Sequence, residues 1–276
     1  IGEFETREKQ FDDALSDILK SKDKHKNEDY LLILKRFNSF TPAIPRVNAY
    51  GSPIFHTVRG GGYFLRWKTK GIAIDPGFNF IENLFSQGLS IWDIDAVILT
   101  HGHNDHYIDL DPMLTLLYQY NKATQNNYKG TMSYKNEKYD EALHYFSNAI
   151  DSPFNNRLSQ AGMLLCLHKK DMVKLDPELL THLNSFLNTE YTIMKEKYPK
   201  GYVTKKIDLL FGRSAHKTVD SFIPLSFDQI DEIHLLNPAS EKLFEEYQLK
   251  MTSIPCKHDD LYGKGYGVGI VLKLLE

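Results

Sequence analysis

The sequence predicts an α/β fold interrupted by a helical insertion, and three observations support this prediction. The apolar run 97–99 ends abruptly in polar residues, as buried parallel strands do at their C-terminal ends. Short strand-like segments with glycine punctuation precede it within 47–77, and strand patterns return at 230–236 and 251–258. Between them, residues 122–221 show helical periodicity and almost no strand pattern.

The N-terminal residues 1–45 are predicted to form helices. Apolar residues recur there at amphipathic spacing in two segments, 5–26 and 29–37. They are Phe11, Leu15, Ile18 and Leu19 in the first segment and Leu31, Leu34 and Phe37 in the second. Prolines at 42 and 45 end the second helix. We expect these helices to pack on the body of the protein or on a partner rather than to carry chemistry.

Composition places the chain among globular proteins. Its 276 residues allow one large domain or one domain with an insertion, and 42% hydrophobic residues suffice for a core. No apolar run approaches the roughly 18 residues that a membrane span needs. Cys166 and Cys256 form no paired framework, which favours a reducing cytoplasm. The chain lacks an initiator methionine and ends just after a strand pattern, so we expect the natural protein to be longer.

Glycine and proline punctuate the segment before the apolar run. The triple glycine 60–62 lacks the Lys-Ser/Thr of a phosphate-binding loop, so it predicts a close approach of two backbones. Asp75 precedes the turn pair Pro76-Gly77 and is interpreted either as a carboxylate that orients a metal-binding histidine or as a plain turn residue. Helices are predicted at 78–88 and 109–121. Asp111 opens the second as an N-cap or a first-turn acid.

The run 97–99 is followed by a dense cluster of metal-binding residue types. These are His101, His103, Asp105 and His106. Imidazole and carboxylate together suit Zn, Fe or Mn. In a loop after a strand, His101 and His103 can point one way while Asp105 and His106 reach a second position, which is the layout of a two-metal hydrolase. The alternative is a polar loop with solvated histidines.

This pattern resembles the metallo-β-lactamase fold superfamily, whose signature is His-x-His-x-Asp-His after a strand. The segments 60–67 and 71–77 are similar to the paired early strands of that family, which end in an Asp-x-Gly turn. The resemblance covers about 46–111 and, more weakly, 222–276. It implies an αββα sandwich whose core is split into 46–121 and 222–276 by the insertion 122–221, with the second part incomplete at the C-terminus.

The resemblance also implies a metal set. It assigns two divalent ions, with Zn expected and Mn or Fe as alternatives, and it gives Asp105 the role of coordinating the second ion and orienting a metal-bound hydroxide. It places a further histidine after a late strand, which makes His258 the third ligand of the first ion, with His216 and His234 as competitors. The bridging aspartate and the last histidine of the family are expected after the final strand, and this sequence ends at Glu276 before either appears. Asp259 and Asp260 follow His258 too closely to be assigned as the bridging residue.

The insertion shows two further patterns. Gly130, Tyr139, Ala142, Phe146, Ala149 and Pro153 keep the spacing of one tetratricopeptide (TPR) repeat, although an ordinary helical hairpin is the alternative. Such a unit is positioned to roof the site or to recruit a protein partner. Lysines and arginine at 195–217 are interleaved with Tyr191, Tyr198 and Tyr202, which predicts either a grip on single-stranded nucleic acid or a solvated helix face.

The function expected from this resemblance is hydrolysis, most specifically of phosphodiesters in a nucleic acid or nucleotide. A net charge of −3 gives no overall attraction to phosphate backbones, so such binding depends on a local patch. One alternative is a hydrolase of small esters, lactones or amides. Another is a non-catalytic interaction module of a larger defence or signalling assembly. Fold alone does not choose among them.

Overall fold

The computed structural model describes residues 28–34, 46–47, 53–54, 61–150, 156–222, 228–236, 241–256, 259–260, 263–264 and 267–275. These residues form two compact units. Unit 1 contains the described residues up to Leu114 and those from Lys206 onward, and unit 2 is Thr115–Lys205. Among the described residues no helix has the length and apolar character that a membrane crossing needs.

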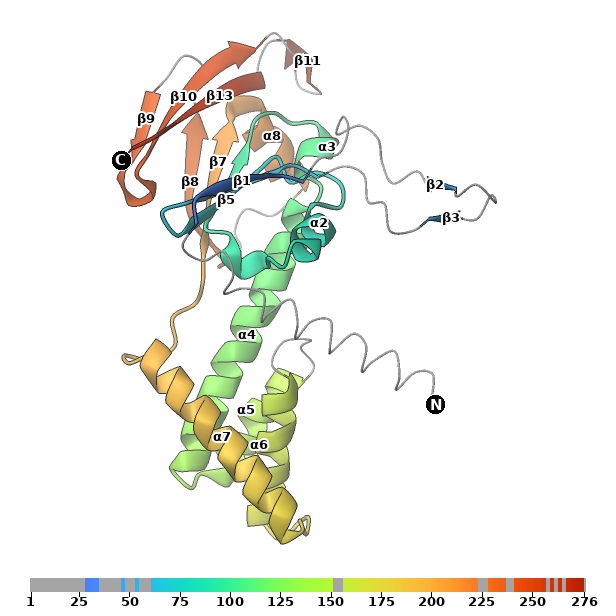
Figure 1. The fold of residues 1–276 in the computed structure, drawn as a ribbon, viewed down its shortest axis with the longest axis vertical. Helices are drawn as coiled ribbons and strands as arrows, with labels where there is room; N and C mark the ends of the chain where they lie inside the picture. The colour runs from blue at the N-terminus through green and yellow to red at the C-terminus, as the bar shows by residue number, and fades with distance from the viewer. Residues whose placement is uncertain are drawn as a thin grey trace. The chain divides into compact units, whose positions relative to one another are not determined.

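Unit 1 is built on a six-stranded mixed sheet (Figure 1), in the order β1-β4-β5-β6-β7-β8. The strands are β1 (Tyr30–Ile33), β4 (Tyr63–Trp67), β5 (Lys70–Ile74), β6 (Ala96–Leu99), β7 (Ile207–Gly212) and β8 (Ile230–Leu236). The pairs β1/β4 and β4/β5 are antiparallel, whereas β5, β6, β7 and β8 run parallel. β6 therefore lies inside the sheet, and all four of its residues are buried, as expected for a parallel strand covered on both faces.

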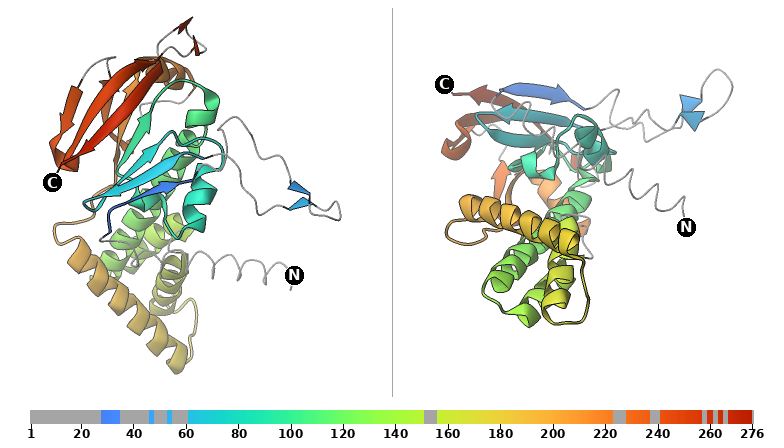
Figure 2. Two further views of the ribbon diagram at one scale, coloured as in Figure 1. Left: turned by 45° about the horizontal axis from the view of Figure 1, so that its top comes forward. Right: turned by 60° about the horizontal axis from the view of Figure 1, so that its bottom comes forward.

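A second, antiparallel sheet packs against the first. Its order is β13-β10-β9, with β9 (Glu241–Phe244), β10 (Leu249–Cys256) and β13 (Gly267–Leu274). Figure 2 shows β10 and β13 as a layer separate from the six-stranded sheet. Apolar side chains of both sheets, among them Leu65, Ile98 and Met251, form one buried cluster between them. The two short hairpins are β2 (Arg46–Val47) with β3 (Pro53–Ile54), and β11 (Asp259–Asp260) with β12 (Gly263–Lys264).

Among the described residues of unit 1, helices follow three strands of the parallel part, β5, β6 and β7. They are α2 (Phe80–Ser86), α3 (Asn104–Tyr107) and α8 (Arg213–Phe222), with the single-turn helices η1 (Ile91–Asp93) and η2 (Glu245–Tyr247). α4 (Leu110–Lys135) begins in unit 1, where Leu110, Met113 and Leu114 are fully buried. The predicted α/β fold with two packed sheets is thereby confirmed.

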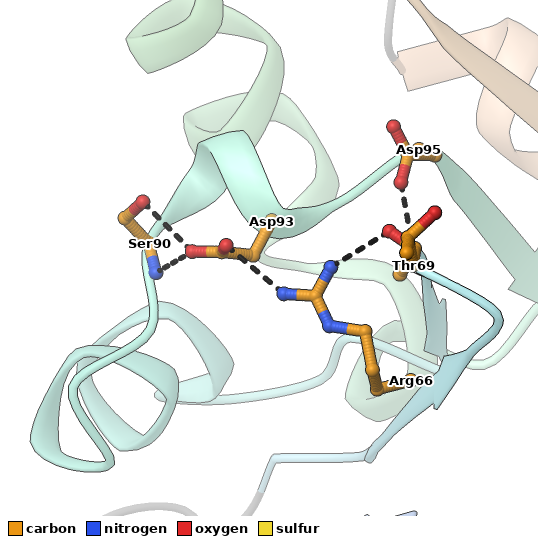
Figure 3. Close-up of polar contacts among 6 residues, drawn as sticks. Arg66, Thr69, Ser90, Asp93 and Asp95 are labelled. Carbon is orange, nitrogen blue, oxygen red and sulfur yellow. Dashed lines mark hydrogen bonds and ion pairs between the residues drawn. The ribbon is translucent and has the colours of Figure 1, made fainter. Parts of the chain in front are cut away.

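A buried ion pair fixes the start of β6. Arg66 Nη2 on β4 donates to Asp93 Oδ1 at 3.0 Å, and Arg66 Nη1 donates to the Thr69 carbonyl at 3.0 Å (Figure 3). The other carboxylate oxygen of Asp93 accepts from both Ser90 N and Ser90 Oγ. Because both charged side chains are buried, removing one leaves the other uncompensated. This cluster anchors the entrance of β6, opposite to the end that carries the histidines.

Unit 2 is helical. α4 continues through it and is followed by α5 (Tyr139–Ile150), α6 (Asn156–Lys169) and α7 (Pro177–Lys197), which gather around α4 in Figure 1. Phe146 of α5 is fully buried, and its ring occupies the space that a Cβ would need at Gly130 on α4 and at Gly162 on α6. The two glycines thus allow three helices to close around one aromatic ring. Whether this unit is a TPR-type repeat stays a prediction.

Two elements differ from the sequence-based expectation. The predicted helix 29–37 is wrong, because residues 30–33 form β1 and pair with β4. The insertion ends at Lys205 instead of 221, because residues 207–212 form β7 within the main sheet and α8 follows in unit 1. The predicted helix at 5–26 lies outside the described residues.

Candidate metal centre

The end of β6 delivers four candidate ligands within six residues. β6 ends at Leu99, and α3 begins at Asn104 with His103 in extended conformation at the N-cap position. His101 and His103 therefore lie in the connecting loop, whereas Asp105 and His106 lie in the first turn of α3. The structure brings all four together. The ring centroids of His101 and His103 are 4.8 Å apart, and those of His101 and His106 are 3.9 Å apart.

The carboxylates surround this imidazole group. Asp105 Oδ2 lies 3.6 Å from His106 Nε2, and Asp75 Oδ2 lies 2.9 Å from His106 Nδ1. The second approach is close, but its geometry is not that of a directed hydrogen bond. Asp75, His106 and Asp105 are all largely shielded from solvent, so their electrostatic interactions are stronger than they would be on the surface.

Asp75 is held by the residue that precedes the first histidine. Its backbone adopts a left-handed conformation, with φ 50°, at the end of β5. Thr100 N donates to Asp75 Oδ1 at 2.8 Å, and Thr100 Oγ1 donates to Asp75 Oδ2 at 2.7 Å. Asp75 thus binds the start of the loop after β6 in addition to forming the turn.

Thr100 is a site residue that the sequence reasoning did not identify. Its hydroxyl also lies 2.9 Å from His101 Nδ1. The hydroxyl has one proton, which it donates to the carboxylate of Asp75, so toward His101 it can only accept. The hydrogen-bond network therefore assigns the proton of neutral His101 to Nδ1 and the lone pair to the buried Nε2. A lone pair on Nε2 is what metal coordination by this histidine requires.

Backbone contacts hold the Asp75 turn against the loop. A Cβ at Gly77 would lie 1.9 Å from the carbonyl oxygen of Asp105, and a Cβ at Gly62 would lie 2.2 Å from that of Asp75. The close backbone approach predicted for the triple glycine is confirmed at Gly62. Asp109, which the sequence reasoning also missed, accepts from Ile81 N at 3.0 Å and so ties α2 to the start of α4. Burial raises the pKa of Asp109.

The side chains after β6 are of the types that bind metal ions, but they do not form a complete ligand set. Three imidazoles and a carboxylate are ligands for Zn or similar ions. Within the described ranges, however, no group of three or more His, Cys, Asp or Glu residues is arranged to hold a metal ion. The predicted third ligand, His258, lies outside those ranges, and the side chains of Asp259 and Asp260 are likewise not described.

The structure describes the contacts of both competitors of His258. His234 lies on β8 with Nδ1 2.7 Å from Lys242 Nζ and Nε2 3.4 Å from a carboxylate oxygen of Glu232. His216 on α8 packs edge-on to the Phe211 ring, with centroids 5.6 Å apart.

The tyrosines of the basic segment have a packing role. Tyr198 and Tyr202 are partly buried, with ring centroids 5.1 Å apart, and Tyr202 Oη donates to Asn121 Oδ1 at 2.7 Å. Desolvation by burial raises the pKa of both hydroxyls. Lys197 lies over the Tyr198 ring. These two rings therefore pack within unit 2, and whether the basic segment contacts nucleic acid stays a prediction.

Comparison with known proteins finds similarity in the segment that contains this loop. Residues 63–117 match the metallo-beta-lactamase superfamily model. The ribonuclease Z of Thermobifida fusca (strain YX) is 30% identical over 91 residues, which are 33% of this chain and 28% of that protein. The ribonuclease Z of Nocardia farcinica (strain IFM 10152) is 39% identical over 49 residues, 18% of this chain and 16% of that protein. The chain thus spans less than a third of these curated relatives.

Two solved structures are similar over most of the chain. The metallo-beta-lactamase fold protein YhfI from Bacillus subtilis is 12% identical with a TM-score of 0.41, covering 87% of this chain and 58% of that one. A diphosphatase from the PhnP family is 14% identical with a TM-score of 0.42, covering 87% of this chain and 61% of that one.

Proposed function

We propose that the protein is a metal-dependent hydrolase of phosphodiester bonds in a nucleic acid or nucleotide. The match of residues 63–117 to the metallo-β-lactamase superfamily is the starting point for this proposal. The observation that carries the proposal is the gathering of His101, His103 and His106 with Asp105 at the end of a buried strand. The local identity to ribonucleases Z supports the phosphodiester class.

The proposal gives each loop residue a role. His101 and His103 would hold the first ion together with His258, and Asp105 and His106 would contribute to the second. Bound divalent ions would lower the pKa of a water molecule from about 15.7 towards about 7 and neutralise charge on the phosphate. Asp105 would also orient the attacking water, and Asp75, whose Oδ2 lies 2.9 Å from His106 Nδ1, would hold His106 in place.

Local packing supports these roles. The loop lies between the Asp75 turn and the first turn of α3, where Gly77 leaves no space beside the Asp105 carbonyl. Thr100 fixes both Asp75 and His101. A site that must hold ions in place needs such support, because ligands alone do not fix their own orientation.

The test is hydrolysis of bis(p-nitrophenyl) phosphate and of a single-stranded RNA oligonucleotide, with added Zn²⁺ or Mn²⁺. We expect Asp105→Asn to lower the rate by about 100-fold or more, because it loses a charged acceptor. Asp111→Asn is the matched control, since this exposed acid lies in the first turn of α4 and outside the proposed ligand set.

Other outcomes would select the rival functions. Turnover of p-nitrophenyl acetate or a lactone, without turnover of either phosphodiester, would replace the proposal by a small-molecule ester hydrolase. Bound metal without any turnover would favour an interaction module. Binding of the RNA that weakens steeply with salt would support a nucleic-acid substrate, since phosphate contacts release counterions.

A further inference from the structure

α7 carries an exposed apolar stripe on the side next to its buried face. Leu179, Phe186 and Ile193 are 41%, 38% and 49% exposed, and they recur at intervals of seven residues. Residues seven apart lie on one side of a helix. The adjacent face of α7 is buried within unit 2, because Leu187 and Met194 pack into the core of that unit. The stripe is therefore additional to the surface that the fold of unit 2 uses.

The residues of this stripe are arranged symmetrically about Phe186. Leu179 lies seven residues before it and Ile193 seven residues after it. His182 and Glu190 lie four residues before and after it. Two antiparallel copies of α7 related by a twofold axis at Phe186 would place Phe186 on Phe186, Leu179 against Ile193, and His182 against Glu190.

Charge distribution favours the antiparallel arrangement. The first turn of α7 carries Glu178 after the N-cap Asp176, and the last turn carries Lys195 and Lys197 on either side of Glu196, so the first turn is acidic and the last turn has a net positive charge. An antiparallel pair brings each acidic end beside the basic end of the other copy, and it also opposes the two helix dipoles. Burial already raises the pKa of Glu190, which fits a carboxylate at the margin of an apolar surface.

We propose that α7 is a self-association surface, through which two copies of this chain pair antiparallel about Phe186. The stripe is short, so the association is weak and concentration-dependent rather than obligate. The proposal concerns unit 2 and does not depend on the metal centre.

A charge-swap experiment tests the twofold axis directly. A residue on the axis meets itself, so Phe186→Lys and Phe186→Glu each place like charges together. Sedimentation velocity of the full chain should show a dimer fraction that rises with concentration. Each variant should have a dimer dissociation constant that is about tenfold higher or more. An equimolar mixture of the two variants should associate again, because each lysine then meets a glutamate.

Matched substitutions exclude a general effect of charge. Thr181 is exposed and lies about 140° from Phe186 around the helix, at 3.6 residues per turn. Thr181→Lys and Thr181→Glu should leave the dimer unchanged, and circular dichroism should show the same helix content in all variants. A monomer at every concentration would overturn the proposal. So would a dimer that Phe186→Lys leaves intact, or association that mixing the folded variants does not restore.

Discussion

The Thr100 hydroxyl donates a hydrogen bond of 2.7 Å to Asp75 Oδ2. The two residues are 25 positions apart, and the parallel pairing of β5 with β6 brings them together. The same hydroxyl accepts from His101, so one side chain couples the carboxylate of the turn to the first candidate ligand. A short chain of hydrogen bonds thus links the turn after β5 to the candidate ligands that follow β6.

Thr100→Val should release His101 from its fixed tautomer. Valine keeps the shape of threonine but cannot accept from Nδ1, so a mixture of neutral tautomers is expected. The measurement is the ¹⁵N chemical shift of the two ring nitrogens of His101 at a pH where the ring is neutral. Thr100→Ser retains the hydroxyl and should restore the wild-type shifts. Unchanged shifts in the valine variant would contradict this role.

Asp75→Asn should destabilise the turn and weaken metal binding together. The amide cannot accept from Thr100 N and Thr100 Oγ1 with the strength of a carboxylate, which costs about 1–3 kcal/mol of unfolding free energy. Loss of such an orienting group lowers metal affinity by about 10–100-fold. Urea unfolding and competitive Zn²⁺ titration measure the two effects. Asp111→Asn is the control, and an equal loss there would show that the effect is not local.

Arg66→Met should be strongly destabilising. It leaves Asp93 buried without its cation, for which about 3–5 kcal/mol is expected. Lys70 and Glu246 form an exposed pair 2.6 Å apart on the same unit, so Glu246→Gln should cost less than about 1 kcal/mol. Chemical denaturation compares them. Similar losses for the two substitutions would contradict the structural role given to the Arg66–Asp93 pair.

Cys166 should be an unreactive thiol. It is fully buried in unit 2, and burial raises its pKa from 9.0 to about 12. Between pH 9 and pH 12 the thiol loses its proton in the unfolded chain but keeps it in the folded chain. The contribution of this thiol to the free energy of unfolding is therefore fully present below about pH 9 and is lost as the pH rises towards 12. Alkylation by iodoacetamide at pH 8, in a Cys256→Ser background, should be slow until the protein unfolds. Cys166→Ala should show a flatter decline of unfolding free energy with alkaline pH, and rapid alkylation of the folded chain would refute the burial argument.

Sequence patterns predicted the helices and strands that have a clear periodicity or apolar run of their own. The buried strand β6, the helix α2 and the start of α4 follow from apolar runs and helical spacing. β1 was missed because Leu31 and Leu34 are also spaced as on a helix, and only pairing with β4 decides for a strand. β7 was missed because it is buried along its whole length, and such a short apolar run has no diagnostic period.

The candidate site divides in the same way. His101, His103, Asp105 and His106 are adjacent in sequence, so their types and spacing sufficed to single them out. The roles of Thr100 and Asp109 depend on partners 25 and 28 residues away, which only the folded chain reveals. A hydroxyl residue directly before the first histidine was the one available signal for Thr100.

The most direct test of the metal centre is elemental analysis of zinc, manganese and iron in the purified chain and in His103→Ala. We expect bound metal in the wild type, restored by dialysis against Zn²⁺ after chelation, and a loss of most of it in the variant. Equal metal content in both proteins, or no metal in either after Zn²⁺ loading of a folded chain, would contradict the assignment of the loop after β6 as a metal centre.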